Sequence, residues 1–496
     1  MIRPGDPTSM LNAARREREL TALRQAGATE VLVIGGGITG VGVALDAAAR
    51  GFQVTLVERH DLAHGTSRWS SKLVHGGLRY LASGNVGVAL ESARERHLLM
   101  TRIAPHLVRA LPTLIPNYGG KDPWISYAGL VAGDVLRKVA GTKRDTLPRA
   151  RFVDTKTALR MAPALRTEGL KGGIVGWDGQ VEDDARLVVA VARTAAAYGA
   201  SILTHVDAVA VGDGRATLRD ESGDFEVACQ EIITCTGVWT GELNPEIALH
   251  PSRGTHLVVR SERLGNPTAS MTVGIPEEFG RFVFAIPQPD GLTYIGLTDL
   301  ETESLVPDPP EPTVEELAWL RERISAALAV PLRAEDVIGT YSGLRPLVSD
   351  AHATTADISR KHLVARQPNG VIAVTGGKLT TYRQMAEDAV DLITSQPCPT
   401  PDIALIGAPG DARSRDRLVR RFGDEAAILE EMVDRDPALG GHVADTPARA
   451  VEVAWAREAE GALTPEEAAE VRLRVTLVDE QRDAALVAVR GLWQRG

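Results

Sequence analysis

Cysteine is scarce in this 496-residue chain, and the spacing of the few cysteines argues against two kinds of architecture. The three cysteines, Cys229, Cys235 and Cys398, show no C-x-x-C spacing, which argues against both a zinc knot held by cysteines and a disulfide framework. We therefore expect reduced thiols in a cytoplasmic protein, and we expect no metal site.

The chain also lacks a long apolar run and an excess of basic residues. Residues 31–49 are interrupted by five glycines and Asp46, so they are a poor candidate for a transmembrane helix. Residues 10–27 are charged and lack the apolar stretch of a secretory signal, which favours a leader helix within residues 1–29. A net charge of −10 argues against nucleic-acid binding, which requires a basic surface.

A glycine-rich segment near the N-terminus is typical of dinucleotide binding. Residues 31–34 read as a buried strand, Gly35, Gly37 and Gly40 form G-x-G-x-x-G, and a helical segment then leads to a strand that ends at Glu58. The first glycine permits a tight turn, the second lets a pyrophosphate approach, and the third lets the helix pack on the sheet. Glu58 can accept the ribose hydroxyls. The alternative is a structural β-α-β unit without a ligand.

The fingerprint alone does not separate NAD from FAD, but two later segments favour FAD. Residues 231–243 form a β-branched strand that runs into Thr236 and Gly237. Residues 370–393 form another strand, then Gly376, Gly377 and Lys378, then an amphipathic helix whose N-terminus could face a flavin or its pyrophosphate. The alternative for the second segment is an ordinary strand-turn-helix unit.

Five strings carry a resemblance to a known family. They are IGGGITGVGVALDAAARG, GTSRWSSKLVHGGLRYL, DGQVEDDARLV, TYSGLRPL and TGGKLTTYRQMAEDAV, and they follow one another from about residue 30 to about residue 393. Together they resemble the FAD-dependent glycerol-3-phosphate dehydrogenases, an aerobic, quinone-linked family. SKLVHGGLRYL and GGKLTTYR are far more specific than the glycine fingerprint.

The resemblance implies a fold and an activity. The expected α/β fold has a Rossmann-like FAD-binding domain, an antiparallel β-sheet substrate domain as in glycine oxidase and D-amino-acid oxidase, and an all-α C-terminal domain. The implied reaction oxidises sn-glycerol 3-phosphate to dihydroxyacetone phosphate by hydride transfer to FAD, and quinone then takes the electrons. The implied location is the cytoplasm, peripheral on the inner face of the cell membrane, and a homodimer is compatible with it.

The resemblance also implies which residues contact FAD. Residues 68–81 wrap the cofactor, and Val206 lies near adenine. The expected contacts are Gly35, Gly36, Gly37, Ile38, Thr39, Gly40, Glu58, Arg59, Thr66, Ser67, Ser71, Lys72, Leu73, His75, Gly76, Gly77, Val206, Gly237, Gly377, Lys378, Leu379 and Thr380.

A phosphate dianion needs several fixed donors, and arginine forks suit its oxygens. Arg79, Arg345 and Lys378 match family positions that contact substrate, and each lies beside glycines at an expected element end. The alternatives are a structural salt bridge for Arg345 and a solvent-facing position for Lys378. The full expected substrate set is Arg79, Tyr80, Asp299, Arg345, Arg360 and Lys378, in which Arg360 is a weaker match and Asp299 is equally compatible with a structural turn.

The reaction needs a group that takes the proton of the C2 hydroxyl, and histidine is the usual candidate. We assign this role to His256, because a similar histidine lies in the family's substrate domain. A positioning or core role for His256 stays open, and Lys378 stabilising an alkoxide is the main rival. The catalytic set is therefore His256, Arg345 and Lys378.

These segments can be assigned to domains. The expected FAD-binding domain is discontinuous and comprises residues 30–105, 170–250 and 346–395. Residues 106–169 and 251–345 form the substrate domain, and residues 403–496 a helical cap. In the cap, LTPEEAAEVRLRV (463–475) departs from the family, since Val471 and Leu473 interrupt a paired-arginine string; this puts any function of those arginines in doubt.

Residues 124–151 bear on the membrane. Trp124 and Tyr127 are followed by apolar residues and then by six basic residues, a pattern that suits an interfacial helix on anionic lipid. The alternative is a core-packed helix with a solvated basic loop.

Two other functions remain open on the sequence alone. One is a related flavoenzyme, such as an α-glycerophosphate oxidase, that reduces oxygen. The other is a flavin-binding module without turnover, against which Arg79, Arg345 and Lys378 argue.

Overall fold

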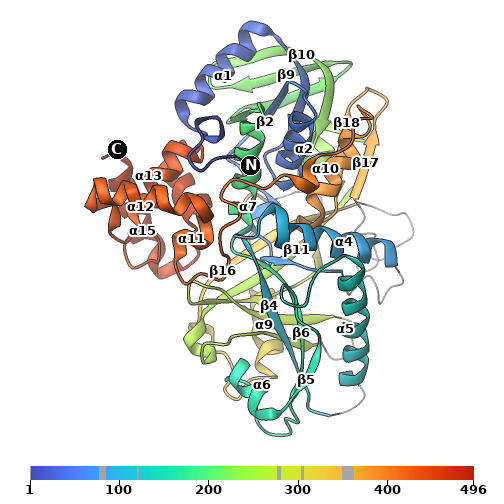
Figure 1. The fold of residues 1–496 in the computed structure, drawn as a ribbon, viewed down its shortest axis with the longest axis vertical. Helices are drawn as coiled ribbons and strands as arrows, with labels where there is room; N and C mark the ends of the chain where they lie inside the picture. The colour runs from blue at the N-terminus through green and yellow to red at the C-terminus, as the bar shows by residue number, and fades with distance from the viewer. Residues whose placement is uncertain are drawn as a thin grey trace.

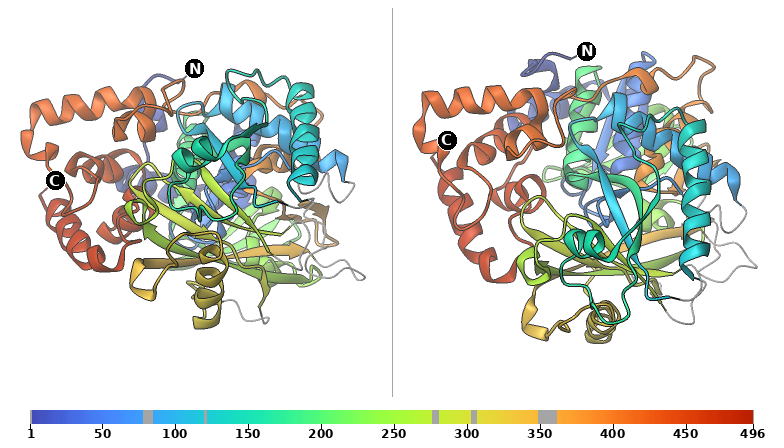
Figure 2. Two further views of the ribbon diagram at one scale, coloured as in Figure 1. Left: turned by 90° about the horizontal axis from the view of Figure 1, so that it is seen from below. Right: turned by 60° about the horizontal axis from the view of Figure 1, so that its bottom comes forward.

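Two β-sheets organise the fold, and a group of C-terminal helices packs beside them. The computed structural model describes residues 2–77, 85–119, 122–275, 281–302, 307–348 and 362–495. Figure 1 shows the first sheet with β10 and α1 at the top, the second sheet with β4 and β6 below it, and the C-terminal helices at the left. Figure 2 shows that these helices form a separate layer at one side of the molecule.

The first sheet is mainly parallel and carries the glycine-rich fingerprint. Its strand order is β17-β18-β10-β1-β2-β7, in which only β17 runs antiparallel to its neighbour, and β8 and β9 extend it beyond β10. The strands are β1 (Ala28–Ile34), β2 (Val54–Glu58), β7 (Ser201–Thr204), β8 (Asp207–Gly212), β9 (Arg215–Asp220), β10 (Gly223–Thr234), β17 (His362–Arg366) and β18 (Ile372–Gly376).

Both faces of this sheet are covered, which explains the continuous apolar run in β1. Val31 and Val33 belong to the core formed with α2 (Ile38–Ala49), α7 (Asp184–Ala197) and α10 (Tyr382–Val390). Leu32 and Ile34 point to the opposite face, where Leu20 and Leu23 of the leader helix α1 (Ala13–Ala26) are buried. Strands buried on both faces read as apolar runs rather than as alternation.

The second sheet has ten strands and is mainly antiparallel. Its order is β15-β11-β14-β13-β12-β4-β6-β3, with β16 paired to β11 and β5 to β6. The strands are β3 (Leu73–Val74), β4 (Val108–Pro116), β5 (Arg151–Val153), β6 (Gly173–Val181), β11 (Leu249–Arg260), β12 (Ser270–Gly274), β13 (Phe282–Pro287), β14 (Leu292–Gly296), β15 (Leu300–Glu301) and β16 (Val337–Val348). Helices α4 (Val86–Leu98), α5 (Asp122–Val139), α6 (Thr155–Met161) and α9 (Val314–Ser325) accompany it.

Strand pairing differs from two of the expected domain boundaries. Residues 173–181, which we assigned to the FAD-binding domain, form β6 and pair with β4 along its whole length. Similarly, β16 continues past residue 345 to Val348 within the second sheet. The return to the first sheet therefore begins with α7.

The C-terminal domain is all-α, as expected. It contains α11 (Arg417–Phe422), α12 (Ala426–Arg435), α13 (Ala450–Ala459), α14 (Pro465–Glu467) and α15 (Asp479–Trp493). Two buried arginines of α7 pair with this domain: Arg193 with Glu425 at 2.6 Å, and Arg186 with Glu460. In the segment where the paired-arginine string is interrupted, Arg472 forms a buried ion pair with Asp61 at 2.6 Å. The divergent segment therefore still supplies an arginine that docks the cap.

Within the described ranges, no helix combines the length and the apolar character that crossing a bilayer requires.

Candidate active site

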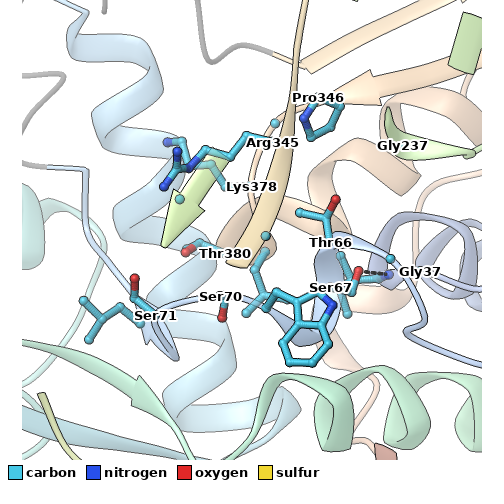
Figure 3. A pocket seen from close by; sticks show the side chains of 18 of the residues that line it. Gly37, Thr66, Ser67, Ser70, Ser71, Gly237, Arg345, Pro346, Lys378 and Thr380 are labelled. Carbon is cyan, nitrogen blue, oxygen red and sulfur yellow. Dashed lines mark hydrogen bonds between the residues drawn. The ribbon is translucent and has the colours of Figure 1, made fainter. Parts of the chain in front are cut away.

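A cavity of about 1040 Å³ lies between the two sheets. Its walls combine the carboxyl ends of β1, β2 and β18 with residues of β4, β6, β11, β12, β13 and β16. Figure 3 shows Gly37 and Ser67 at one side of the view and Arg345 and Lys378 at the other. Ligand pockets in proteins span roughly 300–1,000 Å³, so this cavity is large enough for a dinucleotide together with a small substrate.

The fingerprint glycines bring backbone close to the cavity at the start of α2. Gly35 has φ +114°, and a Cβ there would lie 2.5 Å from the carbonyl oxygen of Cys235. A Cβ at Gly40 would overlap the carbonyl oxygen of Gly35. Helix α2 begins after Gly37, and the Ser67 Oγ accepts the Ile38 N–H at 2.9 Å. The first turn of α2 and Ser67 thus form a polar cradle that suits an anion.

Glu58, at the end of β2, is held by backbone donors. Its Oε2 accepts the Gly36 N–H at 2.6 Å, and its Oε1 accepts the His60 N–H at 2.8 Å. Burial raises the pKa of the Glu58 carboxyl, and these N–H groups oppose that shift by stabilising the charged form. Each carboxylate oxygen keeps a further lone pair for a ligand hydroxyl.

The Lys378 side chain reaches the cavity from the turn after β18. Gly376 and Gly377 have φ of +78° and +69°, so the turn uses backbone conformations that favour glycine. Lys378 precedes the short helix Leu379–Thr381, and its Nζ donates to the Ser92 Oγ at 2.9 Å.

The register between β11 and β16 places Arg345 in the same cavity. Gly254 pairs with Gly343 and Ser252 with Arg345, so these side chains share one face of the sheet. The Arg345 Nη1 donates to the Asp299 Oδ1 at 3.1 Å and to the Ser252 Oγ at 3.2 Å. A Cβ at Gly254 would overlap the Arg345 guanidinium, so this glycine makes room for the arginine.

His256 lies on the same face of β11 and is almost fully buried. Its Nε2 is 2.8 Å from the Ser71 Oγ, and its ring stacks on Tyr341 with centroids 4.5 Å apart. The Nδ1 has no hydrogen-bond partner in the described part of the chain. Burial, with smaller contributions from the charges of Arg345 and Lys72, lowers the pKa of His256 to about 3. The imidazole is therefore neutral at physiological pH.

Comparisons with known proteins agree on one family. A family model described as "FAD dependent oxidoreductase" matches residues 30–383. The chain is 46% identical over 511 residues to "Glycerol-3-phosphate dehydrogenase 1" of Mycobacterium tuberculosis, covering 98% of this chain and 99% of that protein. It is 36% identical to "Glycerol-3-phosphate dehydrogenase 2" of the same organism, covering 95% of this chain and 85% of that protein. The chain belongs to the FAD-dependent glycerol-3-phosphate dehydrogenase family.

Solved structures support the same fold. The glycerol-3-phosphate dehydrogenase of Bacillus halodurans, complexed with FAD, superposes with a TM-score of 0.73 at 26% identity and covers 98% of this chain and 95% of that chain. The L-α-glycerophosphate oxidase of Mycoplasma pneumoniae has a TM-score of 0.58 at 19% identity, with 76% of this chain and 99% of that chain covered. The latter likeness concerns the fold alone.

The residues of this glycerol-3-phosphate dehydrogenase family member fit FAD. The cradle at Gly37 and Ser67 suits the pyrophosphate, and Glu58 offers acceptors for the ribose. The expected FAD contacts that line the cavity are Gly35, Gly37, Ile38, Thr39, Glu58, Arg59, Thr66, Ser67, Ser71, Leu73, His75, Val206, Gly237, Gly377, Lys378, Leu379 and Thr380. Of the expected substrate set, Asp299, Arg345 and Lys378 line it, whereas Arg79, Tyr80 and Arg360 lie outside the described residues.

Five expected FAD contacts do not line the cavity: Gly36, Gly40, Lys72, Gly76 and Gly77. The glycines support the cavity wall through close packing, as Gly40 does against Gly35. The Lys72 side chain is buried and forms an ion pair with Asp184 on α7, so its ammonium does not face the cavity. Its charge therefore helps to fix the loop that carries Ser71.

Sequence reasoning missed a group of aromatic side chains behind and beside this site. Trp69 stacks on Tyr341 at 5.8 Å, so the chain Trp69, Tyr341, His256 forms a continuous stack. On β13, Phe282 and Phe284 face the cavity while Val283 and Ala285 belong to the core on the other face of the sheet. The period-two alternation in RFVFAIP was a usable signal for this second group.

Proposed function

We propose that the chain oxidises sn-glycerol 3-phosphate to dihydroxyacetone phosphate. The observation that carries this proposal is the placement of Arg345 and Lys378 in the cavity that fits FAD. Two fixed cations suit a phosphate dianion, and the Asp299 and Ser252 contacts hold the arginine fork in one orientation. Arg79, Tyr80 and Arg360 complete the proposed substrate set on the strength of the family resemblance.

Bound FAD supplies the two-electron acceptor for the hydride that leaves C2 of the substrate. The protein then has to orient the C2 carbon and take the proton of the C2 hydroxyl. Neutral His256 has an acceptor nitrogen for that proton, and its hydrogen bond to Ser71 and its stack on Tyr341 fix the ring. Because burial lowers its pKa to about 3, proton transfer to this imidazole depends on the negative charge that the substrate phosphate brings to the site. The Lys378 ammonium stabilises negative charge that develops on the oxygen as the proton leaves.

We propose quinone as the electron acceptor. The end of the cavity nearest α5 is lined by the aromatic and aliphatic side chains of Trp177, Phe282, Phe284 and Ile115, together with Ile125 and Leu130 of α5. Such a surface suits a planar apolar molecule far better than it suits glycerol phosphate. These apolar side chains favour quinone over oxygen as the electron acceptor, because oxygen does not need an apolar binding surface.

We further propose that the protein docks peripherally on an anionic membrane surface through α5. The outward side of this helix carries a stripe of exposed apolar residues, namely Trp124, Val131, Val135 and Val139, which are 66%, 41%, 58% and 60% exposed. Exposed basic residues flank the stripe at Lys138, Lys143, Arg144 and Arg149. Apolar insertion combined with cation attraction is how interfacial helices bind lipid.

Anaerobic mixing of the holoenzyme with glycerol 3-phosphate tests the proposed reaction. We expect the visible flavin absorbance to bleach with one equivalent of substrate, and we expect glycerol to bleach it far more slowly. A flavin that stays oxidised would overturn the proposal and leave a binding module. Mixing the reduced enzyme with oxygen or with a short-chain quinone then identifies the acceptor, since reoxidation that is faster with oxygen would contradict the quinone assignment.

A further inference from the structure

Three side chains with metal-ligating atoms meet at the rim of the cavity. His60 and His64 follow β2 in the loop after Glu58, and Asp308 comes from the chain beyond β15. The His64 Nε2 is 3.0 Å from both carboxylate oxygens of Asp308, and the His60 Nε2 is 3.8 Å from the Asp308 Oδ2. One ligand atom from each residue lies within 4.8 Å of the other two.

The chemistry of this set matches a zinc ion. Zinc binds imidazole nitrogen at about 2.0–2.1 Å and carboxylate oxygen at about 2.0–2.2 Å in a tetrahedron, which puts neighbouring ligand atoms roughly 3.4 Å apart. The two nitrogen–oxygen distances of 3.0 and 3.8 Å lie on either side of that value. Two imidazoles also disfavour magnesium and calcium, which prefer oxygen ligands.

The His60 and His64 side chains can reorient to complete a tetrahedral site. The imidazole rings of His60 and His64 are stacked with centroids 4.0 Å apart and planes 24° from parallel. Convergence on one ion requires each ring to turn, and both side chains are partly exposed, at 42% and 23%. Arg59, the cation next to His60 in the sequence, already pairs with Glu242 at 3.2 Å, which offsets its repulsion of a second positive charge.

We propose that His60, His64 and Asp308 bind one Zn²⁺ ion, with water as the fourth ligand. The ion would tie the loop that follows the ribose-binding Glu58 to a segment of the substrate domain. Because His60 and His64 line the cavity, this tie lies across the adenosine end of the FAD site. Bound zinc therefore slows the release of FAD.

Equilibrium dialysis of the holoenzyme against ZnCl₂, followed by metal determination, tests the site. We expect one Zn²⁺ per chain with micromolar affinity, a loss of at least tenfold in affinity in His60→Gln, His64→Gln and Asp308→Asn, and no competition from a large excess of Mg²⁺. The matched control is His250→Gln, which removes the histidine of the exposed His250–Glu301 pair and should leave zinc binding unchanged. Absence of stoichiometric binding, or equal binding by all four variants, would overturn the proposal.

A second readout concerns FAD itself. Dilution of the holoenzyme into a denaturant-free buffer, followed by flavin fluorescence, gives the rate of FAD release with and without ZnCl₂. We expect zinc to slow release at least threefold in the wild type and to have no effect in His64→Gln. Equal slowing in the variant would show that zinc acts elsewhere and would overturn the tie across the cavity.

Discussion

The guanidinium of Arg345 lies directly over the backbone of Gly254 on the neighbouring strand. These two residues face the same side of the sheet, and a Cβ at position 254 would overlap the arginine. The glycine therefore sets where the cation sits, although it contributes no functional group of its own.

We expect Gly254→Ala to lower kcat/KM for glycerol 3-phosphate by at least ~30-fold, which is about 2 kcal/mol, because the displaced guanidinium loses charge-assisted bonds to the phosphate. FAD content should stay normal, since Gly254 lies on β11 of the second sheet, whereas the fingerprint joins β1 to α2 in the first. The control is Gly241→Ala, where a Cβ meets nothing within 4 Å. Steady-state kinetics with unchanged kcat/KM in Gly254→Ala would refute the displacement.

Arg345→Ala removes the cation itself. We expect kcat/KM for the phosphate ester to fall at least ~100-fold, about 2.7 kcal/mol, with FAD retained. Plain glycerol is the control substrate because it has no phosphate to lose. If the variant is impaired equally on glycerol and on glycerol 3-phosphate, Arg345 is structural.

His256 should make stability depend on pH. Burial lowers its pKa to about 3 in the folded protein, whereas an unfolded chain titrates near its ordinary 6.5. Between these values the unfolded state binds more protons, so the free energy of unfolding falls as pH falls, by about 1.4 kcal/mol per pH unit. In His256→Gln the slope between pH 6 and pH 4 should be smaller by about that amount, as measured by denaturant unfolding.

The exposed His442 supplies the control for this measurement. His442→Gln should keep the wild-type slope, and an identical slope in His256→Gln would show that the His256 imidazole does not stay neutral in the fold.

Cap docking should depend on Arg472. Burial raises the pKa of Asp61, and Arg472 is the ion-pair partner that opposes this shift. Arg472→Ala leaves a buried carboxylate unpaired, and we expect a loss of about 3–5 kcal/mol in the free energy of unfolding. Arg490→Ala, which breaks an exposed pair with Glu466, should cost less than ~1 kcal/mol. An equal loss in the free energy of unfolding for both variants would mean that water reaches the Asp61 carboxylate once Arg472 is removed.

Vesicle binding should depend on where the cations lie rather than on their number. Replacing Lys138, Lys143, Arg144 and Arg149 with Gln should weaken co-sedimentation with anionic vesicles at least ~100-fold, because each cation contributes about 1 kcal/mol. Arg137 is excluded because it is buried and paired with Asp134 at 3.4 Å. Turnover with a soluble acceptor should persist in this variant.

A control variant with the same change in net charge isolates the effect of position. Substitution of exposed arginines on the C-terminal domain with Gln should leave vesicle binding intact; the set is Arg413, Arg435, Arg482 and Arg490. Equal loss in both variants would indicate a response to net charge and would contradict docking through α5.

Local patterns predicted the parts of the fold that local contacts determine. The fingerprint identified β1, α2 and β2 because these three elements follow one another directly in the sequence. The place of β6 could not be read in the same way, since it depends on pairing with β4 some sixty residues earlier. The expected domain boundary therefore fell on the wrong side of that strand.

The site shows the same limit. Arg345 and Lys378 stood out because cations beside glycines at element ends are conspicuous in a sequence. Lys72 entered the expected FAD contacts through the family resemblance, but its partner Asp184 is 112 residues away, and no local signal could show that the pair is buried. The link between Ser71 and His256 spans 185 residues and is equally invisible to a pattern.

The parallel sheet takes neighbouring strands from opposite ends of the chain, and this constrains how the protein can be made. β10 pairs with β1 on one side and with β18 on the other, and β18 begins only at Ile372. On the ribosome, the end of β10 that pairs with β18, at Ile233 and Thr234, therefore lacks this neighbour until about three quarters of the polypeptide has been translated. An open strand edge recruits other strands, so nascent chains that stall in this interval are exposed to aggregation. Flavin can complete its contacts only after that interval ends, which makes cofactor loading a late step of biosynthesis.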